Sequence, residues 1–404
     1  MFFDFLKENC EMRHIDEYYG GVFGGELGSF PGDSRADRIE SFFRANGVGM
    51  RVSGVEAGPV VTRYAVELEG DTDRVSRVEA LRRDLGLRLG VGASRVYIGE
   101  SEWRGGVSLT IEVPNAERVA VPSGCVVPEC GDGPGLRVCL GVDASGRPFS
   151  VDLARAPHVL VAGQSGSGKS VFLDSLVCGL VANRPAHECT VAIVDPKGTE
   201  FCAFEGHPSV GVPGGRRGVV GSDGAVGLVE RLVEEMEERN AMLRFYGCRT
   251  LAELHARGVY YHGGVARPYI VAVVDEFYDL VTGYGDAFAG PLSVLAAKAR
   301  STGIHLVLAT QRPSADVIRG ALKANLSTRV ALKVASRTDS QVILDRPGAE
   351  SLCGRGDMLY MGPDGDAPRR LHGCWLPESE VAEMVRRARE SEGSPDGLWS
   401  ACAG

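Results

Sequence analysis

The sequence predicts an α/β protein with a mostly parallel central sheet, preceded by a small α+β domain. In the second half of the chain, short continuous runs of Val, Ile and Leu alternate with helical segments, which is typical of parallel strands covered on both faces. In the first half, alternating strand patterns surround one helical pattern. The five apolar runs are His158–Ala162, Thr190–Val194, Tyr269–Val274, Ile304–Ala309 and Arg329–Val334.

The small domain is expected over residues 36–120 in the order β-β-α-β-β. Apolar residues fall on alternate positions in Val60–Glu69, which indicates a strand, and Met50–Val55 precedes it across a Gly-Pro turn. From Asp73 to Leu89 they recur every three or four positions, which indicates an amphipathic helix facing a sheet. Two further strands are expected at Ser94–Gly99 and Val107–Val113.

The remaining segments differ in composition. Residues 1–35 are rich in Gly and aromatic residues without a period and predict an irregular arm. Residues 121–150, rich in Gly and Pro, predict a linker with one short strand, Leu136–Leu140. The main domain is expected over 151–392, and 393–404 form a polar tail expected to be flexible.

Composition limits the classes of function. No run approaches the roughly 20 apolar residues that cross a bilayer, and the charged N-terminus is unlike a signal peptide. The 11 cysteines contain no CxxC pair, so neither a zinc site nor a disulfide framework is expected. We therefore expect a cytoplasmic protein with no membrane association. The net charge of −9 excludes a globally basic surface but allows a basic channel inside a ring.

A phosphate-binding loop follows the first strand of the parallel sheet. The segment GQSGSGKS fits the pattern GxxxxGK[ST] and lies between a strand and a helix. Backbone N–H groups of such a loop and the helix N-terminus surround the phosphates of ATP. We expect Lys169 at the β- and γ-phosphates and the Ser170 hydroxyl on Mg²⁺. The expected nucleotide-binding residues are Gly163, Gln164, Ser165, Gly166, Ser167, Gly168, Lys169, Ser170 and Val171.

Acidic and amide side chains at other strand ends complete the predicted catalytic set. Asp275 and Glu276 follow the third run; Asp275 is expected to hold Mg²⁺ and Glu276 to act as general base. Gln311 follows the fourth run, where neighbouring strand ends meet, so it would sense the γ-phosphate or position the water. The competing interpretation is an amide that caps the next turn. Asp195 ends another strand, and its role stays open.

These segments resemble the motor region of the FtsK/SpoIIIE DNA translocases, over Arg38 to Arg389. The resemblance implies a RecA-like P-loop NTPase motor (the β domain) preceded by an α domain. It further implies a homo-hexameric ring that threads double-stranded DNA and binds ATP between neighbouring subunits. The matching segments include HVLVAGQSGSGKSV (His158–Val171), VDPKGTEF (Val194–Phe201), PYIVAVVDEFYDL (Pro268–Leu280) and the long stretch Ala297–Leu332.

A nucleotide between subunits implies an arginine that reaches the site from the neighbouring subunit and stabilises charge on the transferred phosphoryl group. Arg300 is the candidate for this arginine finger and Arg329 the alternative, with an ordinary surface salt bridge as the competing interpretation. DNA contacts are expected from Arg337 and Arg355, in loops after the last sheet strands, unless these are solvated charges.

Two features usual in this family are absent from the sequence: membrane helices ahead of the motor and a C-terminal winged-helix module. The expected function is therefore that of a soluble ATP-dependent translocase on double-stranded DNA, with sequence specificity supplied by a partner protein. One alternative is a ring ATPase that moves proteins in secretion, although such chains tend to carry several ATPase modules. The other is a motor for conjugative plasmid transfer.

Overall fold

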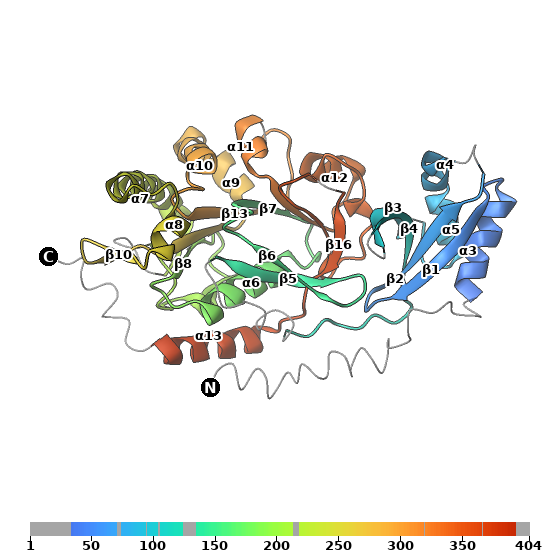
Figure 1. The fold of residues 1–404 in the computed structure, drawn as a ribbon, viewed down its shortest axis with the longest axis horizontal. Coiled ribbons are helices and arrows are strands. Elements are labelled where there is room, and N and C mark those ends of the chain that lie inside the picture. The colour runs from blue at the N-terminus through green and yellow to red at the C-terminus, as the bar shows by residue number, and fades with distance from the viewer. Residues whose placement is uncertain are drawn as a thin grey trace.

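The computed structural model describes residues 34–70, 74–93, 95–103, 106–123, 135–212, 218–318, 320–365 and 367–392. Most of the predicted N-terminal arm and the predicted tail lie outside these ranges. Two bodies lie side by side in Figure 1: a small domain in blue and a larger domain that runs from green to red. In the part of the chain that the structure describes, no helix is both long and apolar enough to cross a membrane.

The small domain is a four-stranded antiparallel sheet in the order β1-β2-β4-β3. Its core gathers apolar side chains from the sheet and from the helix that precedes it, among them Phe43, Tyr64 and Ile111. The strands are β1 (Met50–Ala57), β2 (Val61–Leu68), β3 (Tyr97–Trp103) and β4 (Gly106–Pro114). The helices are α3 (Ser34–Ala45), α4 (Val75–Ala80) and α5 (Arg82–Arg88).

The small domain differs from the prediction in two elements. The single helix expected over Asp73–Leu89 is divided at Leu81, whose N–H bonds to the carbonyl of Val78 in a tighter i−3 pattern. The strand expected to end at Gly99 continues through it, because Gly99 pairs with Thr110 inside the β3–β4 ladder.

The motor domain contains a ten-stranded sheet in the order β6-β5-β16-β15-β14-β7-β13-β12-β8-β9. Strands from β14 to β9 pair in parallel, and β15, β16, β5 and β6 extend the sheet in antiparallel pairs. The parallel strands are β7 (His158–Ala162), β8 (Cys189–Val194), β9 (Val219–Val220), β12 (Tyr269–Val274), β13 (Ile304–Thr310) and β14 (Thr328–Leu332). The predicted apolar runs thus form the parallel part of the sheet, with small shifts at their ends.

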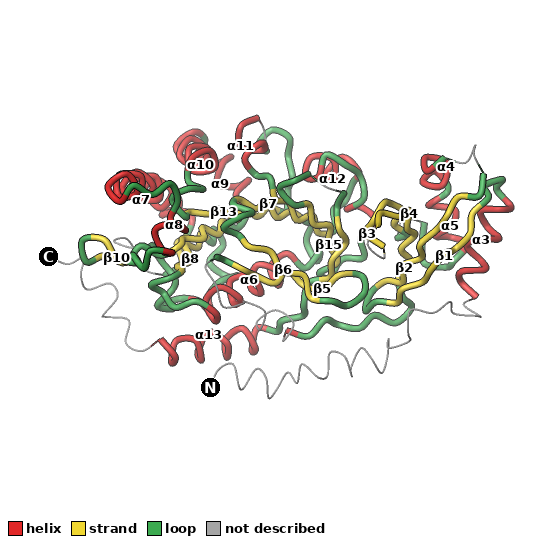
Figure 2. The backbone as a smooth tube through the Cα atoms, in the orientation of Figure 1, coloured by secondary structure: helices red, strands yellow, loops and turns green. Residues whose placement is uncertain are grey.

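Helices cover both faces of this sheet, and Figure 2 shows the strands in yellow between two layers of red helices. Side chains of β7 alternate: Val159 and Val161 join one core cluster, whereas Leu160 and Ala162 join the other. On the first face lie α6 (Lys169–Asn183), α8 (Leu251–Ala256) and α13 (Glu378–Glu392). On the second lie α7 (Ala225–Tyr246), α9 (Phe277–Tyr284), α10 (Asp286–Lys298), α11 (Gly320–Asn325) and α12 (Arg337–Leu344).

The segment expected to be a linker with one strand carries a β-hairpin instead. Its strands β5 (Arg137–Asp143) and β6 (Pro148–Asp152) pair with each other, and β5 pairs with β16 (Arg369–His372) of the motor sheet. The four residues between them, 144–147, form a tight turn, in which the Asp143 carboxylate accepts from the Ser145 and Arg147 N–H groups. The other antiparallel strand is β15 (Asp357–Met361), and a small hairpin joins β10 (Tyr261–His262) to β11 (Val265–Ala266).

Candidate nucleotide-binding site

The predicted phosphate loop joins β7 to the N-terminus of α6. Gly166 and Gly168 have φ values of 74° and 101°, which side-chain-bearing residues rarely adopt. A Cβ atom on Gly168 would also lie 2.4 Å from the backbone nitrogen of Gly356. Neighbouring strands anchor the other end of the loop: the Gly163 N–H donates to the Thr310 carbonyl (3.2 Å). The loop therefore has a fixed backbone, with the first turn of a 15-residue helix behind it.

A buried ion pair brings the phosphate loop to the end of β12. The ammonium of Lys169 contacts the carboxylate of Asp275, and the two side chains are 4% and 1% exposed. Ser170, in the first turn of α6, is half-buried. Three residues predicted from two separate motifs thus lie at one edge of the sheet, at the carboxyl ends of β7 and β12.

Glu276 is held in an unusual backbone conformation directly after Asp275. Its φ of 48° is in the left-handed region, which costs about 1–3 kcal/mol for a residue other than glycine. Its carboxylate accepts hydrogen bonds from the Thr310 hydroxyl (2.7 Å) and from the Gln311 backbone N–H (3.1 Å). The structure thus brings Gln311 to Glu276 through its main chain, and it adds Thr310, which sequence reasoning missed although it ends the same apolar strand.

Asp195, whose role the sequence left open, folds its own loop. Its buried carboxylate accepts four backbone N–H groups, which closes the turn that follows β8. The donors are Lys197, Gly198, Glu200 and Phe201. A carboxylate engaged in this way is a structural group. Near this loop, burial and then the charge of Glu200 raise the pKa of Asp174 on α6 to about 7.

Arg300 lies on the opposite edge of the sheet from the phosphate loop. It precedes β13, whereas Gln311 follows it, and seven strand residues separate the two ends by about 20 Å. Its side chain is exposed and has no ion-pair or hydrogen-bond partner among the described residues. Arg329, by contrast, donates to the Leu326 carbonyl (3.1 Å) and pairs with Asp345. Arg329 is therefore engaged within its own subunit, whereas Arg300 has no such partner in the described part of the chain.

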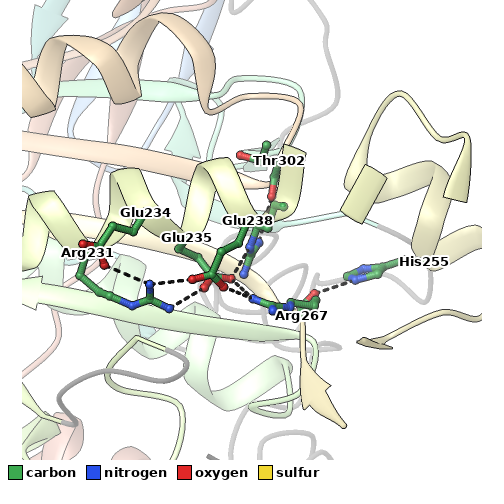
Figure 3. Close-up of polar contacts among 8 residues, drawn as sticks. Arg231, Glu234, Glu235, Glu238, His255, Arg267 and Thr302 are labelled. Atoms are coloured by element: carbon green, nitrogen blue, oxygen red, sulfur yellow. Dashed lines mark hydrogen bonds and ion pairs between the residues drawn. The ribbon is translucent and has the colours of Figure 1, made fainter. Parts of the chain in front are cut away.

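A buried charge cluster supports the loop that carries Arg300 (Figure 3). On α7, the fully buried Arg239 donates to Glu235 (2.7 Å) and to the carbonyl of Thr302 (2.9 Å), two residues after Arg300. Arg267 and Arg231 also bind the Glu235 carboxylate, at 2.8 and 3.1 Å. Sequence reasoning assigned no role to this cluster, although its Glu-Arg spacing of four on one helix was a usable signal.

The two predicted DNA-contacting arginines lie in different surroundings. Arg355, at a φ of 55°, lines a cavity of about 690 Å³ beside the phosphate loop, together with Gly166, Gly168 and the exposed Trp375. It therefore lies beside the phosphate loop, on the side of Gly166 and Gly168. Arg337 is exposed and begins helix α12, where a loop was expected.

Comparison with known proteins identifies the family of this chain. A model of the FtsK/SpoIIIE family matches residues 132–315, and a model of the FtsK alpha domain matches residues 32–115. The DNA translocase FtsK 2 of Neisseria meningitidis serogroup A is 36% identical over 370 residues, which cover 86% of this chain and 36% of that protein. The chain belongs to the FtsK/SpoIIIE family. The predicted family is thereby confirmed.

Solved structures support the fold. The pCW3 conjugation coupling protein TcpA with ATPγS has a TM-score of 0.58 at 21% identity, covering 88% of this chain and 100% of that chain. The cytoplasmic domain of the type VII secretion ATPase EccC from Thermomonospora curvata has a TM-score of 0.57 at 26% identity, covering 69% of this chain and 34% of that chain. The predicted fold class is confirmed. The chain spans less than half the length of the curated FtsK relatives it matches.

Proposed function

We propose that this chain is an ATP-hydrolysing motor that moves along double-stranded DNA. The observation that carries the proposal is the convergence of Lys169, Asp275 and Glu276 at one edge of the motor sheet, in a member of the FtsK/SpoIIIE family. Each of these groups has a task in phosphoryl transfer. The curated relatives named DNA translocase supply the substrate class.

The chemistry follows from the contacts at this edge. The backbone N–H groups of the phosphate loop and Lys169 bind the phosphates of ATP. Mg²⁺ fits the Ser170 hydroxyl and the Asp275 carboxylate, which are the oxygen ligands it prefers, and it would neutralise charge on the phosphates. Glu276 takes the proton from the attacking water, and its bonds to Thr310 and to the Gln311 N–H orient the carboxylate for that step.

We also propose that active sites are completed between subunits of a homo-hexameric ring. Arg300 is too far along β13 to reach its own phosphate loop, and its side chain is unengaged among the described residues. It suits an arginine finger for the neighbouring site, which is worth about 10³–10⁵ in rate. Arg300→Ala and Lys169→Ala should each abolish hydrolysis.

A mixture of the two inactive variants tests this arrangement. Sites that combine the intact loop of one variant with the intact arginine of the other make up about a quarter of a random one-to-one ring. Partial recovery of hydrolysis on mixing supports sites shared between subunits. A mixture as inactive as its components contradicts them.

The DNA substrate is tested by the hydrolysis rate with linear duplex DNA, with single-stranded DNA and without DNA, at two salt concentrations. Strong stimulation by duplex that weakens steeply with salt is expected, because contacts to phosphates release counterions. The exposed Arg337 at the start of α12 is the proposed contact, and Arg337→Ala should reduce the salt dependence. Unstimulated hydrolysis with every DNA overturns the proposal.

A second candidate function is the movement of a protein substrate. The observation in its favour is the similarity to EccC, which is a secretion ATPase. The same assay distinguishes the two, because a protein-moving ATPase would hydrolyse ATP at a rate that duplex DNA leaves unchanged.

A further inference from the structure

A buried chain of charged side chains crosses the contact between the small domain and the motor domain. Glu112 on β4 of the small domain accepts hydrogen bonds from Arg370 on β16 of the motor (3.1 Å) and from Arg63 on β2 (3.1 Å). The side chains of Glu112 and Arg370 are each 1% exposed. Water screens the attraction between these buried charges only weakly, so the attraction holds the two side chains in place.

Arg370 has a second carboxylate partner within the motor domain. Its Nε and Nη2 atoms donate to the two oxygens of Asp357, at 2.9 and 2.7 Å, in the bidentate arrangement that fixes both groups in one plane. The Asp357 carboxylate also accepts the backbone N–H of Cys353 (2.6 Å). Burial raises the pKa of Asp357, but Arg370 outweighs burial and holds that pKa well below its usual range. The guanidinium thus connects the small domain to the start of β15.

The turn before Asp357 packs directly against the phosphate loop. The Gly356 N–H donates to the Ser167 carbonyl (2.8 Å), and the Gly356 carbonyl accepts from Gly373 (2.8 Å). No side chain fits between this turn and the loop, because a Cβ on Gly168 would overlap Gly356. Any displacement of the turn is therefore passed to the loop backbone.

We propose that Arg370 is a positioning residue that couples the docking of the small domain to the shape of the phosphate loop. The path runs from Glu112 through Arg370 and Asp357 to Gly356 and Ser167. The inference rests on the proposed function in one respect, that the loop binds ATP. Coupling is reciprocal, so a nucleotide that orders the loop also strengthens the docking of the small domain.

The test is the affinity of the full chain for ATPγS, measured by calorimetry. Glu112→Gln keeps the shape of the side chain but removes its charge and replaces one of its two acceptor oxygens by an amide group that cannot accept from an arginine. It should raise the Kd about five- to tenfold. The matched control is Arg82→Gln, which breaks a second ion pair across the same domain contact, Arg82 to Glu350 at 3.6 Å. Glu350 has no hydrogen bond to the phosphate loop among the described residues, so the control should leave the Kd within about twofold of wild type.

A second pair of variants separates positioning from loss of structure. In an Arg370→Met background, Glu112→Gln should have no further effect on the Kd, because the path is already broken. Arg370→Lys keeps the charge without the bidentate geometry. Its Kd should lie between those of the wild type and Arg370→Met, and it should raise the KM for ATP more than it lowers kcat.

The outcomes distinguish this inference from the proposed function. An unchanged Kd in Glu112→Gln, or an equal rise in Arg82→Gln, overturns the coupling while leaving ATP binding intact. Wild-type protein that fails to bind ATPγS overturns the proposed function itself.

Discussion

The charge cluster beneath the Arg300 loop supports a quantitative prediction for Arg239→Met. The substitution keeps the length of the side chain but removes the hydrogen bonds to Glu235 and to the Thr302 carbonyl. Removing one member of a buried ion pair typically costs 3–5 kcal/mol. Here Arg267 and Arg231 still bind Glu235, so we expect about 3 kcal/mol, the lower end of that range.

The matched control is Arg231→Met on the same helix. Arg231 is 24% exposed and also pairs with two surface glutamates, so its loss should cost about 0.5–1 kcal/mol. At about 2–4 °C per kcal/mol, the thermal midpoint of the motor domain should fall by about 6–12 °C in Arg239→Met and by about 1–4 °C in the control.

Thermal unfolding followed by circular dichroism measures both shifts, and a double-mutant cycle with Glu235→Gln isolates the pair. A loss in Arg239→Met no larger than that of the control would refute the account of the cluster. Hydrolysis supplies a second readout: Arg239→Met should lower kcat at temperatures where it remains folded, because the loop carrying Arg300 has lost its support.

Three further predictions concern the nucleotide site. Glu276→Gln should bind ATPγS normally and hydrolyse ATP about 10²- to 10⁴-fold more slowly, and normal turnover would show that Glu276 is not the base. Arg355→Ala should raise the KM for ATP about tenfold and leave the salt dependence of duplex binding unchanged. An unchanged KM with a weaker salt dependence would instead indicate that Arg355 contacts DNA. Asp174 has a pKa of about 7 in the folded chain against about 4 when unfolded, so the folded state binds the proton more tightly and loses stability as pH rises between these values. Asp174→Asn should therefore raise the thermal midpoint above that of the wild type at pH 8 and not at pH 4. Equal midpoints of variant and wild type at pH 8 would show that Asp174 does not destabilise the folded state.

Local patterns in the sequence were sufficient for the parallel strands and the phosphate loop. Continuous apolar runs buried on both faces have a distinctive composition, and β7 and β12 lie where they were predicted. The antiparallel strands β15 and β16 were missed, because they contain buried charges such as Asp357 and Arg370. A strand that carries charges inside the protein does not have the apolar pattern on which the prediction depended.

The site was predictable where a motif fixes the chemistry and unpredictable where partners are distant in sequence. Lys169 was predicted from the phosphate-loop motif, and Asp275 from its place at the end of an apolar strand. The link between Glu112 and Arg370 joins positions 258 residues apart, and no local signal pairs them. The surroundings of Arg355 likewise depend on tertiary packing, which places its turn against the phosphate loop.

The central claim, that the chain is a motor on double-stranded DNA, is tested most directly by displacement of a third strand from a triplex on linear duplex DNA. The account predicts that the wild-type chain displaces the third strand when ATP is present, with a delay that grows with the distance from the duplex end. The Glu276→Gln variant should bind the same DNA and displace nothing. Hydrolysis stimulated by duplex without any displacement would contradict the claim, because the energy of ATP would then not be used to move along DNA.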